Sequence, residues 1–343
     1  MVLNVSAARG PFSIVKVRAW QYDVAGQAGH NVPLILLDTD LPENRPEDRE
    51  LTHWLYGGDE AYRLKQEIVL GVGGVRMLAA LALRVQRYHL NEGHAALLAL
   101  ELLRVQGVTG TDPVKLQEGI AQVRRRCVFT THTPVQAGHD QFPHALAESL
   151  LARIVPATLL RALDRQDRFN LTWLALRLSG WVNGVADRHA QTSRRLFPGY
   201  EVHAITNGVH ALTWTAPAMQ ALFDRYIPRW CHEPELLVRA LGLPDEEVAA
   251  ARGGARQALL QSIRGLPGGE AFDAQRFTIG FARRMTDYKR PGLLFSDLAR
   301  LRQIAARHPI QVVISGKAHP HDAAGKAHIE QLHRIAHELA GVV

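Results

Sequence analysis

The sequence predicts an α/β fold in which short parallel strands alternate with helices. The first observation is that apolar, β-rich runs are repeatedly followed by a polar loop and then by a stretch with helical spacing. The second is that 343 residues with 47% hydrophobic content are enough for two cores. The third is a change of composition near residues 211–217. We therefore predict two α/β domains, residues 1–213 and 214–343.

The first part of the chain predicts a hairpin followed by a helical segment. "PFSIVKVRAWQYDV" alternates with period two and predicts a strand that forms one arm of the hairpin. "VPLILLDTD" predicts a short strand, which would be buried on both faces if it were a central strand of its sheet, and "LPENRPEDRE" predicts a proline-rich polar loop. Helical spacing over residues 59–87 is interrupted by "GVGG" at residues 71–74, which lacks the G-x-G-x-x-G spacing and favours close helix packing.

Further strand, loop and helix units follow. "YHLNEGHAALLALELLR" predicts a strand end, a loop and a helix, with Asn91 as N-cap and Glu92 in the first turn. A strand over residues 127–131 runs into a histidine-rich loop, and "EVHAITNGVHALTW" predicts another short strand with a polar loop. Helices are expected over residues 216–273. Two more strands, before residues 283 and 316, complete the pattern.

Ligands of open parallel sheets bind at the carboxyl ends of the strands. The loops to consider therefore follow Leu90, Thr131, Ile205, Phe281 and Ile314.

The loop after Phe281, "ARRMTDYKRP", carries four cations: Arg283, Arg284, Lys289 and Arg290. We expect Pro291 to be the first residue of the next helix, whose free N–H groups would face the same loop. Cations beside a positive helix end repel one another unless an anion lies among them, and phosphate suits such a site. The alternative is a solvated loop in which Asp287 pairs with one cation.

Lys317, which follows the next strand, is a candidate second contributor to a phosphate site. His132 directly follows a strand and is placed to bind a ligand, although a histidine satisfied within the core is the competing interpretation. The spacing of His132, His139 and His144 does not match known metal sites, so we predict no metal.

Several classes of protein are disfavoured by composition. The net charge of +7 and the pI of about 9.7 come from arginines spread over helix faces, and aromatic residues make up only 7%. We therefore favour solvated arginine over nucleic-acid binding. No membrane span or secretory signal is evident, and the two cysteines lack metal or redox spacing. A cytoplasmic location is expected.

At this point several loops together resemble the α-glucan phosphorylases, the family of starch, glycogen and maltodextrin phosphorylases, in its short bacterial class. The resemblance covers nearly the whole chain from about Ala19. The segments that carry it occur in the order of the family: "DTDLPENRPEDRELTHWLYGGDEAYRLKQEIVLGVGG", "YHLNEGHAALLALELLR", "VFTTHTPVQAGHDQF", "ITNGVHALTW", "GFARRMTDYKRP" and "VVISGKAHP".

The resemblance implies a glycosyltransferase-B fold with two Rossmann-like domains and an active site between them. Residues 1–213 would be a glucan-binding domain incomplete at its start, and residues 214–343 the beginning of a phosphate- and cofactor-binding domain. The implied reaction is reversible phosphorolysis of an α-1,4-glucan to glucose 1-phosphate, with pyridoxal 5′-phosphate as cofactor and inorganic phosphate as substrate. A homo-oligomer is compatible with the resemblance.

The resemblance also implies roles for individual residues. Arg284 and Lys289 would hold phosphate, while Tyr288 and Asn207 would contact glucose hydroxyl groups. His132 would bind near the glucose 6-hydroxyl, and Glu92 matches an acidic position close to the cleft.

Two departures from the family accompany these matches. The glycine-rich segment with which the family begins and the lysine that forms the Schiff base with the cofactor have no counterpart in this sequence. We therefore expect a central fragment that is inactive by itself. The alternatives are a non-catalytic remnant that binds carbohydrate or phosphate, and a nucleotide-sugar glycosyltransferase of the same architecture.

Overall fold

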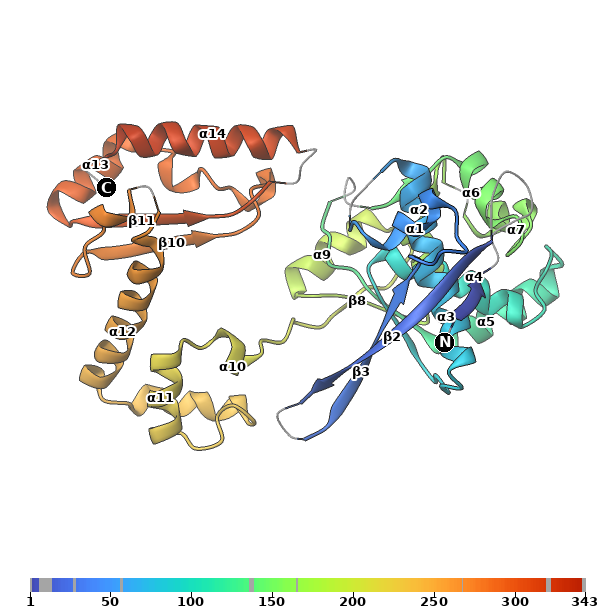
Figure 1. Ribbon diagram of the computed structural model, residues 1–343, viewed down its shortest axis with the longest axis horizontal. Coiled ribbons are helices and arrows are strands. Elements are labelled where there is room, and N and C mark those ends of the chain that lie inside the picture. The colour runs from blue at the N-terminus through green and yellow to red at the C-terminus, as the bar shows by residue number, and fades with distance from the viewer. Residues whose placement is uncertain are drawn as a thin grey trace. The chain divides into compact units, whose positions relative to one another are not determined.

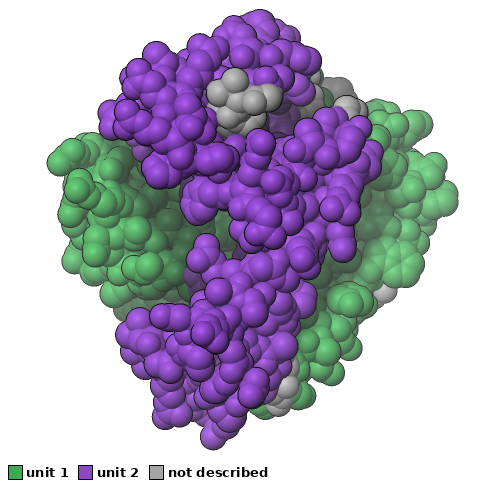
Figure 2. Space-filling model, turned by 90° about the vertical axis from the view of Figure 1, so that its left-hand side faces the viewer, with its two compact units in different colours: residues 1–208 green, residues 209–343 purple. Residues whose placement is uncertain are grey.

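The computed structural model describes residues 2–5, 14–26, 29–55, 58–135, 139–164, 166–266, 268–318 and 322–340. The chain forms two compact units, residues 1–208 and 209–343, which are coloured separately in Figure 2. Each unit is described by itself below. The division lies at Gly208, slightly before the boundary predicted at residues 213/214.

Unit 1 contains the strands β1 (Val2–Val5), β2 (Val15–Ala25), β3 (Asn31–Asp38), β4 (Tyr88–Asn91), β5 (Cys127–Thr130), β6 (Gln141–Phe142), β7 (Phe169–Asn170), β8 (Trp181–Gly184) and β9 (His203–Ala204). Its α-helices are α1 (Pro46–Arg49), α2 (Glu60–Ile68), α3 (Gly74–Ala80), α4 (Leu98–Val105), α5 (Pro113–Arg126), α6 (His144–Leu151), α7 (Ala157–Leu163), α8 (Leu171–Leu178) and α9 (Asp187–Leu196). Figure 1 shows the chain from blue to red.

A four-stranded parallel sheet with the order β4-β5-β8-β9 forms the centre of unit 1. The register pairs Leu90 with Phe129 and Phe129 with Val182, all of which are buried. Helices α5 and α8 pack against β5, and α9 packs against β8. Because all four strands run the same way, their carboxyl ends lie at one edge of the sheet.

The predicted glycine interruption is a π-helical turn, Val69–Gly73, between α2 and α3. A Cβ atom built on Gly71 would lie 2.8 Å from the backbone nitrogen of Leu98 at the start of α4. Close packing, rather than a phosphate-binding loop, therefore explains this glycine. Gly74 is different, because a Cβ atom there would meet no atom within 4 Å.

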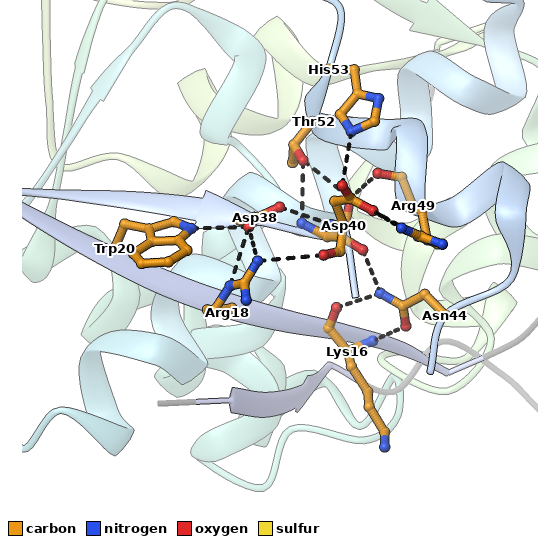
Figure 3. A network of polar contacts seen from close by, with 10 residues as sticks. Lys16, Arg18, Trp20, Asp38, Asp40, Asn44, Arg49, Thr52 and His53 are labelled. Carbon is orange, nitrogen blue, oxygen red and sulfur yellow. Dashed lines mark hydrogen bonds and ion pairs between the residues drawn. The ribbon is translucent and has the colours of Figure 1, made fainter. Parts of the chain in front are cut away.

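Strands β2 and β3 form an antiparallel hairpin in the three-stranded sheet β1-β2-β3, so the predicted hairpin arm is confirmed (Figure 1). The polar segment after β3 is anchored to the hairpin base (Figure 3). Asp38 accepts hydrogen bonds from Arg18 Nη2 (2.6 Å) and Trp20 Nε1 (2.9 Å). The side chain of Asn44 is buried and bonds both the N–H and the C=O of Lys16 at 2.8 Å.

Two expectations for this region are corrected. Strand β3 is the edge strand of its sheet and not a central one, and most of its residues are exposed, so the burial on both faces that a central strand would have does not occur. One hairpin face is apolar and exposed, and consists of the cross-strand pairs Trp20–Leu36, Tyr22–Leu34 and Val24–Val32. The second error concerns the loop "LPENRPEDRE", which contains the short helix α1 with Pro46 in its first turn.

Unit 2 contains α10 (Ala211–Trp214), α11 (Pro217–Tyr226), α12 (Asp245–Ile263), β10 (Phe277–Ala282), α13 (Leu298–Arg307), β11 (Ile310–Ser315) and α14 (Ala323–Glu338). Strands β10 and β11 pair in parallel. Leu301, Ile310 and Ile335 belong to a small core that joins α13, β11 and α14.

The structure confirms a mixed α/β fold with parallel sheets. Among the residues that it describes, no helix combines the length and apolar character that crossing a bilayer requires.

The glycine pair offers a test of this packing. We expect Gly71→Ala to lower the free energy of unfolding of unit 1 by about 2 kcal/mol, because the new methyl group would press on backbone that cannot move aside. Gly74→Ala is the matched control, and should raise stability by roughly 0.5–1 kcal/mol because alanine favours the helix. Urea denaturation measures both. Equal destabilisation by the two variants would contradict the close packing at Gly71.

Candidate functional site

The carboxyl edge of the central sheet carries a pocket of about 500 Å³. It is lined by side chains that follow β4, β5, β8 and β9, so four separate segments of unit 1 contribute to it. The lining residues are His89, Asn91, Thr130, His132, Asn183, Val185, Ile205, Thr206, Asn207 and Gly208. The parallel register therefore brings together His132 and Asn207, two of the predicted site residues.

His132 lies two residues beyond the end of β5 and is held by its backbone. Its N–H donates a hydrogen bond to Glu92 Oε1, and the hydroxyl of Thr133 donates to the same oxygen at 3.0 Å. The Nε2 atom of His132 is buried and has no hydrogen-bond partner among the described residues. A buried nitrogen without a partner is costly, so this atom is suited to bind a ligand in the pocket.

Glu92, which joins β4 to the following turn, has a strained backbone. Its φ of 61° and ψ of −174° lie in a region that only glycine adopts without cost. The backbone N–H of Glu92 donates to Thr130 O at 2.9 Å, while its carboxylate holds the loop after β5. The strain is therefore compensated by contacts that tie the β4 and β5 loops together. Asn91, expected as a helix N-cap, instead ends β4.

A line of polar side chains crosses the pocket floor. His89 Nε2 lies 2.6 Å from Thr130 Oγ1, and that hydroxyl donates to Asn183 Oδ1 at 3.1 Å. Because Thr130 donates to Asn183, it accepts from His89, which places a proton on Nε2 of His89. Asn183 is buried, and its amide nitrogen donates to the Gly184 carbonyl at 3.3 Å. The line holds these polar groups in fixed orientations.

Asn207 reaches the pocket from an extended segment beyond β9. Ile205 N and Asn207 N donate to Gly184 O (3.0 Å) and Val185 O (3.1 Å). The side chain of Asn207 is exposed at the pocket.

The sequence reasoning missed three residues at this edge: His89, Asn183 and His189. His189 lies in α9, and burial lowers its pKa although a hydrogen bond with the His132 main chain and the charge of Glu92 oppose that shift. The signal that could have found Asn183 is its place at the end of the short strand "WVNG". His89 stands on a strand beside Asn91, one residue before the buried Leu90.

The other histidines of the predicted His-rich loop belong to the core. His139 is buried against the ring of Phe197 at 5.4 Å, and His144 Nε2 lies 2.8 Å from Gln166 O. Residues 136–138 of this loop lie outside the described residues.

A second group of titratable side chains lies behind the strained turn. His94 Nδ1 lies 3.1 Å from Asp140 and 3.3 Å from the buried Glu67. These three residues could offer metal ligands, but the guanidinium of Arg63 contacts all of them, at 2.6 Å from Glu67, 2.8 Å from His94 and 3.1 Å from Asp140. Arg63 therefore supplies positive charge where a cation would lie.

The same contacts shift the pKa values of the group. Hydrogen bonds to Asp140 and Glu67 raise the pKa of His94 to about 9, because these bonds and the charges of the two carboxylates outweigh burial, which acts in the opposite direction. Burial raises the pKa of Glu67. Burial acts in the same direction on Asp140, but hydrogen bonds and charges from His94 and Arg63 outweigh it and lower its pKa to about 2.

In unit 2, the loop 283–290, here called the cationic corner, follows β10. Arg283 N donates to Ser315 O at 3.1 Å, and Met285 N donates to Lys317 O at 3.0 Å. The corner thus continues alongside the end of β11, beside Lys317. Arg284 is exposed and Lys289 half-buried, with its Nζ 4.7 Å from the ring centroid of Tyr288.

For the cationic corner, one expectation is wrong, and the pairing of Asp287 that the alternative interpretation required is not observed. Pro291 does not begin a helix, because α13 starts only at Leu298, where Asp297 accepts a hydrogen bond from Arg300 N at 2.9 Å. Asp287 does not pair with a cation of the corner, because its carboxylate contacts His328 of α14. Among the described residues, the four cations of the corner have no carboxylate partner in ion-pair contact.

Comparison with known proteins shows that the chain is similar to maltodextrin and glycogen phosphorylases along nearly its whole length. It is 36% identical to the maltodextrin phosphorylase of Thermococcus litoralis, over 94% of this chain and 42% of that protein. It is 35% identical to the glycogen phosphorylase of Mycobacterium bovis, over 97% of this chain and 43% of that protein. It is 32% identical to the glycogen phosphorylase of Aquifex aeolicus, over 88% of this chain and 49% of that protein. No family model matches the chain.

These similarities confirm the resemblance predicted from the motifs. The chain spans less than half the length of the curated relatives just described.

The raised pKa of His94 predicts a pH dependence of stability. Protonated His94 stabilises the folded state fully below pH 6.5, and this contribution is lost as the pH rises through about 9. Since His94 is 39% exposed, solvent screening limits the effect to roughly 1–2 kcal/mol. Urea denaturation of unit 1 at pH 6, 7.5 and 9 measures it. The variant His94→Gln should show a smaller change in the free energy of unfolding between pH 6 and 9. Parallel pH profiles for the wild type and this variant would contradict the role of His94.

The strained turn gives a second prediction. Glu92→Ala keeps the strain and loses the carboxylate, whereas Glu92→Gly loses both, so the glycine variant should be more stable by about 1–2 kcal/mol. Both should expose the His132 amide to faster hydrogen exchange, and Glu92→Gln, which retains an acceptor oxygen, should protect it. Thermal denaturation and exchange measure these effects. A glycine variant no more stable than the alanine variant would show that the turn is unstrained.

Proposed function

We propose, on the premise that this chain is related to glycogen and maltodextrin phosphorylases along nearly its whole length, that it serves reversible phosphorolysis of α-1,4-glucan. The products would be glucose 1-phosphate and a glucan shortened by one glucose unit. The observation that carries this proposal is the pocket at the carboxyl edge of the central sheet. There, the buried, unpartnered Nε2 of His132 and the exposed amide of Asn207 line the same space.

The pocket suits a sugar ring because its polar groups are held in place before binding. Hydroxyl groups of glucose can both donate and accept, and Asn207 offers a carbonyl oxygen and an NH₂ group to them. His132 Nε2 would bind the hydroxyl on carbon 6. The polar line of His89, Thr130 and Asn183 would keep the floor of the pocket in one orientation, which reduces the entropy lost on binding.

Glu92 and the loop after β5 that its carboxylate holds would act on the anomeric carbon. When the glycosidic bond breaks, positive charge develops on the sugar ring. The carboxylate of Glu92 and the backbone that it holds would lie close to that charge and stabilise it, because a fixed negative group needs no reorganisation as the bond breaks. This assigns Glu92 a role in both positioning and electrostatics.

The phosphate would bind at the cationic corner of unit 2. Arg284 would contact it with two N–H groups and Lys289 as a point charge, while Lys317 stands beside the corner. Tyr288, which carries Lys289 over its ring, would reach a glucose hydroxyl. With the helix start displaced to Leu298, the four cations without carboxylate partners are what supports an anion here.

This assignment requires both units to contribute to one reaction, as in a glycosyltransferase-B fold. We include that arrangement in the proposal. Phosphate is favoured over a sugar nucleotide as the second substrate because the relatives are glycogen and maltodextrin phosphorylases. A carbohydrate- and phosphate-binding protein without turnover is the remaining alternative, and glucose 1-phosphate formation distinguishes it.

Pyridoxal 5′-phosphate is the cofactor that the resemblance implies, and it would supply a phosphate group for proton transfer. The residues described here do not provide its covalent anchor. A Schiff-base lysine is held in a desolvated site, but none of the six lysines is buried: Lys16, Lys65, Lys115, Lys289, Lys317 and Lys326. Lys65 is paired with Asp48 at 2.8 Å. We therefore derive no step through the cofactor.

Phosphate binding tests the proposal directly. Inorganic phosphate should raise the melting temperature of the chain, and calorimetric titration should show at least tenfold weaker binding for Arg284→Ala and Lys289→Ala, since each removes a charge-assisted contact. Arg334→Ala, which removes an exposed arginine near the other end of α14, is the control. If the control weakens phosphate binding as much as Arg284→Ala does, the corner is not a specific phosphate site.

A further inference from the structure

The carboxyl end of β8 is packed against the ring of a histidine. Gly184 is the last residue of β8, and a Cβ atom built on it would lie 2.5 Å from Nδ1 of His189 and 3.2 Å from the backbone nitrogen of Ala190, both in α9. Atoms in a well-packed core do not approach one another so closely. Gly184 does not have a positive φ. The glycine is therefore required for the space that it leaves to the His189 ring and not for its own backbone conformation.

The strand end that meets this ring is fixed by hydrogen bonds. The Gly184 carbonyl accepts from Ile205 N at 3.0 Å and from the side-chain amide of Asn183 at 3.3 Å. Thr131 N donates to Asn183 O at 3.0 Å. These bonds tie the end of β8 to the segments on both of its sides. Because of them, the strand end is not free to move aside for a displaced ring.

His189 also contacts the loop that carries His132. The register pairs Thr130 of β5 with Asn183 of β8, so the loop after β5 runs past the strand end against which α9 packs. The ring of His189 forms a hydrogen bond with the His132 main chain, and its Nδ1 lies 3.4 Å from Oγ of the buried Ser193. Burial lowers the pKa of His189, so its imidazole is neutral at pH 7.

The main chain at His132 is thus held by two different residues. The carboxylate of Glu92 accepts the His132 N–H, and the ring of His189 contacts the same stretch of backbone. The Nε2 atom of His132 has no hydrogen-bond partner among the described residues. Because no bond at Nε2 orients the His132 ring, the position of this atom depends on the backbone that carries it.

Other histidines of unit 1 show what a purely structural histidine contacts. His139 packs on the ring of Phe197, and His144 lies 2.8 Å from the Gln166 carbonyl. Neither of them lines the pocket of His132. The His189 ring differs, because it contacts the end of a central strand and the main chain of a pocket residue.

We propose that His189 is a positioning residue for His132 and that Gly184 provides the space for its ring. This inference rests on the proposed function, in which His132 Nε2 binds the hydroxyl on carbon 6 of glucose. His189 itself would touch no substrate and would act through the backbone. A binding group has to be held within about 0.5 Å of its working position. Loss of His189 should therefore reduce the selectivity for this hydroxyl group.

Hydrogen exchange of the His132 amide tests the support without a ligand. His189→Ala should accelerate this exchange at least tenfold, and Gly184→Ala should also accelerate it, because the new methyl group displaces the ring. In the double variant the methyl group no longer meets the ring, so the second substitution should add less than twofold to the first. Arg188→Ala replaces the exposed neighbour of His189 in α9 and is the matched control, with a change of less than twofold.

Calorimetric titration with glucose and 6-deoxyglucose tests the link to binding. The wild type should prefer glucose at least fivefold, and Arg188→Ala should keep this preference. His189→Ala and Gly184→Ala should reduce it to less than twofold. His189→Gln, which retains a side-chain N–H, should recover part of it and replaces the alanine variant if that variant does not fold. A variant that is only destabilised would bind both sugars more weakly and keep the preference.

The two measurements separate this inference from the proposed function. If the wild type binds no glucose, the proposed function is contradicted, and the exchange of the His132 amide still decides on His189. If this exchange in His189→Ala stays within twofold of the wild type, the positioning role is overturned. A full preference for glucose in both His189→Ala and Gly184→Ala would overturn it as well.

Discussion

The parallel register of β4, β5, β8 and β9 is the constraint on which the pockets at the two edges of the central sheet depend. Each strand has only two to four residues, so a side chain just beyond its end lies close to the side chains beyond its neighbours. At the carboxyl edge this gathers His132, Asn183 and Asn207 from distant parts of the sequence. At the amino edge it gathers arginines and an indole. One core thus shapes two pockets that are lined by different kinds of side chain.

The carboxyl edge also shows how strain and binding are connected. Glu92 adopts a backbone conformation that costs on the order of 1–3 kcal/mol, and its carboxylate is engaged by the loop of His132. A relaxed backbone would point this carboxylate elsewhere and release that loop. Next to this turn, His94 joins the charged group of Arg63, Glu67 and Asp140. The strained turn is thus followed directly in the chain by a residue of the charged group, while its own carboxylate holds the loop at the pocket.

Much of this arrangement could be predicted from the sequence where a residue stands directly after an apolar strand. His132 and Asn207 are such residues, and the structure brings them to one pocket. The strained conformation of Glu92 could not be predicted, because no local pattern marks a glutamate for positive φ. Pro291 misled the prediction, because a proline favours a helix start but does not require one, and Asp297 caps α13 instead. The apolar run of β3 gave no information on burial, which depends on what packs against the strand.

The exposed apolar face of the hairpin is a surface through which we expect copies of this chain to associate in solution. Trp20 and Tyr22 on β2, together with Leu34 on the edge strand β3, form an exposed apolar surface, and such surfaces favour association. The net charge of +7 keeps approaching copies apart over distances of about a Debye length, roughly 10 Å at 0.1 M salt. Added electrolyte removes that repulsion and leaves the apolar surface untouched. We therefore expect the colloidal stability of the chain to fall as ionic strength rises.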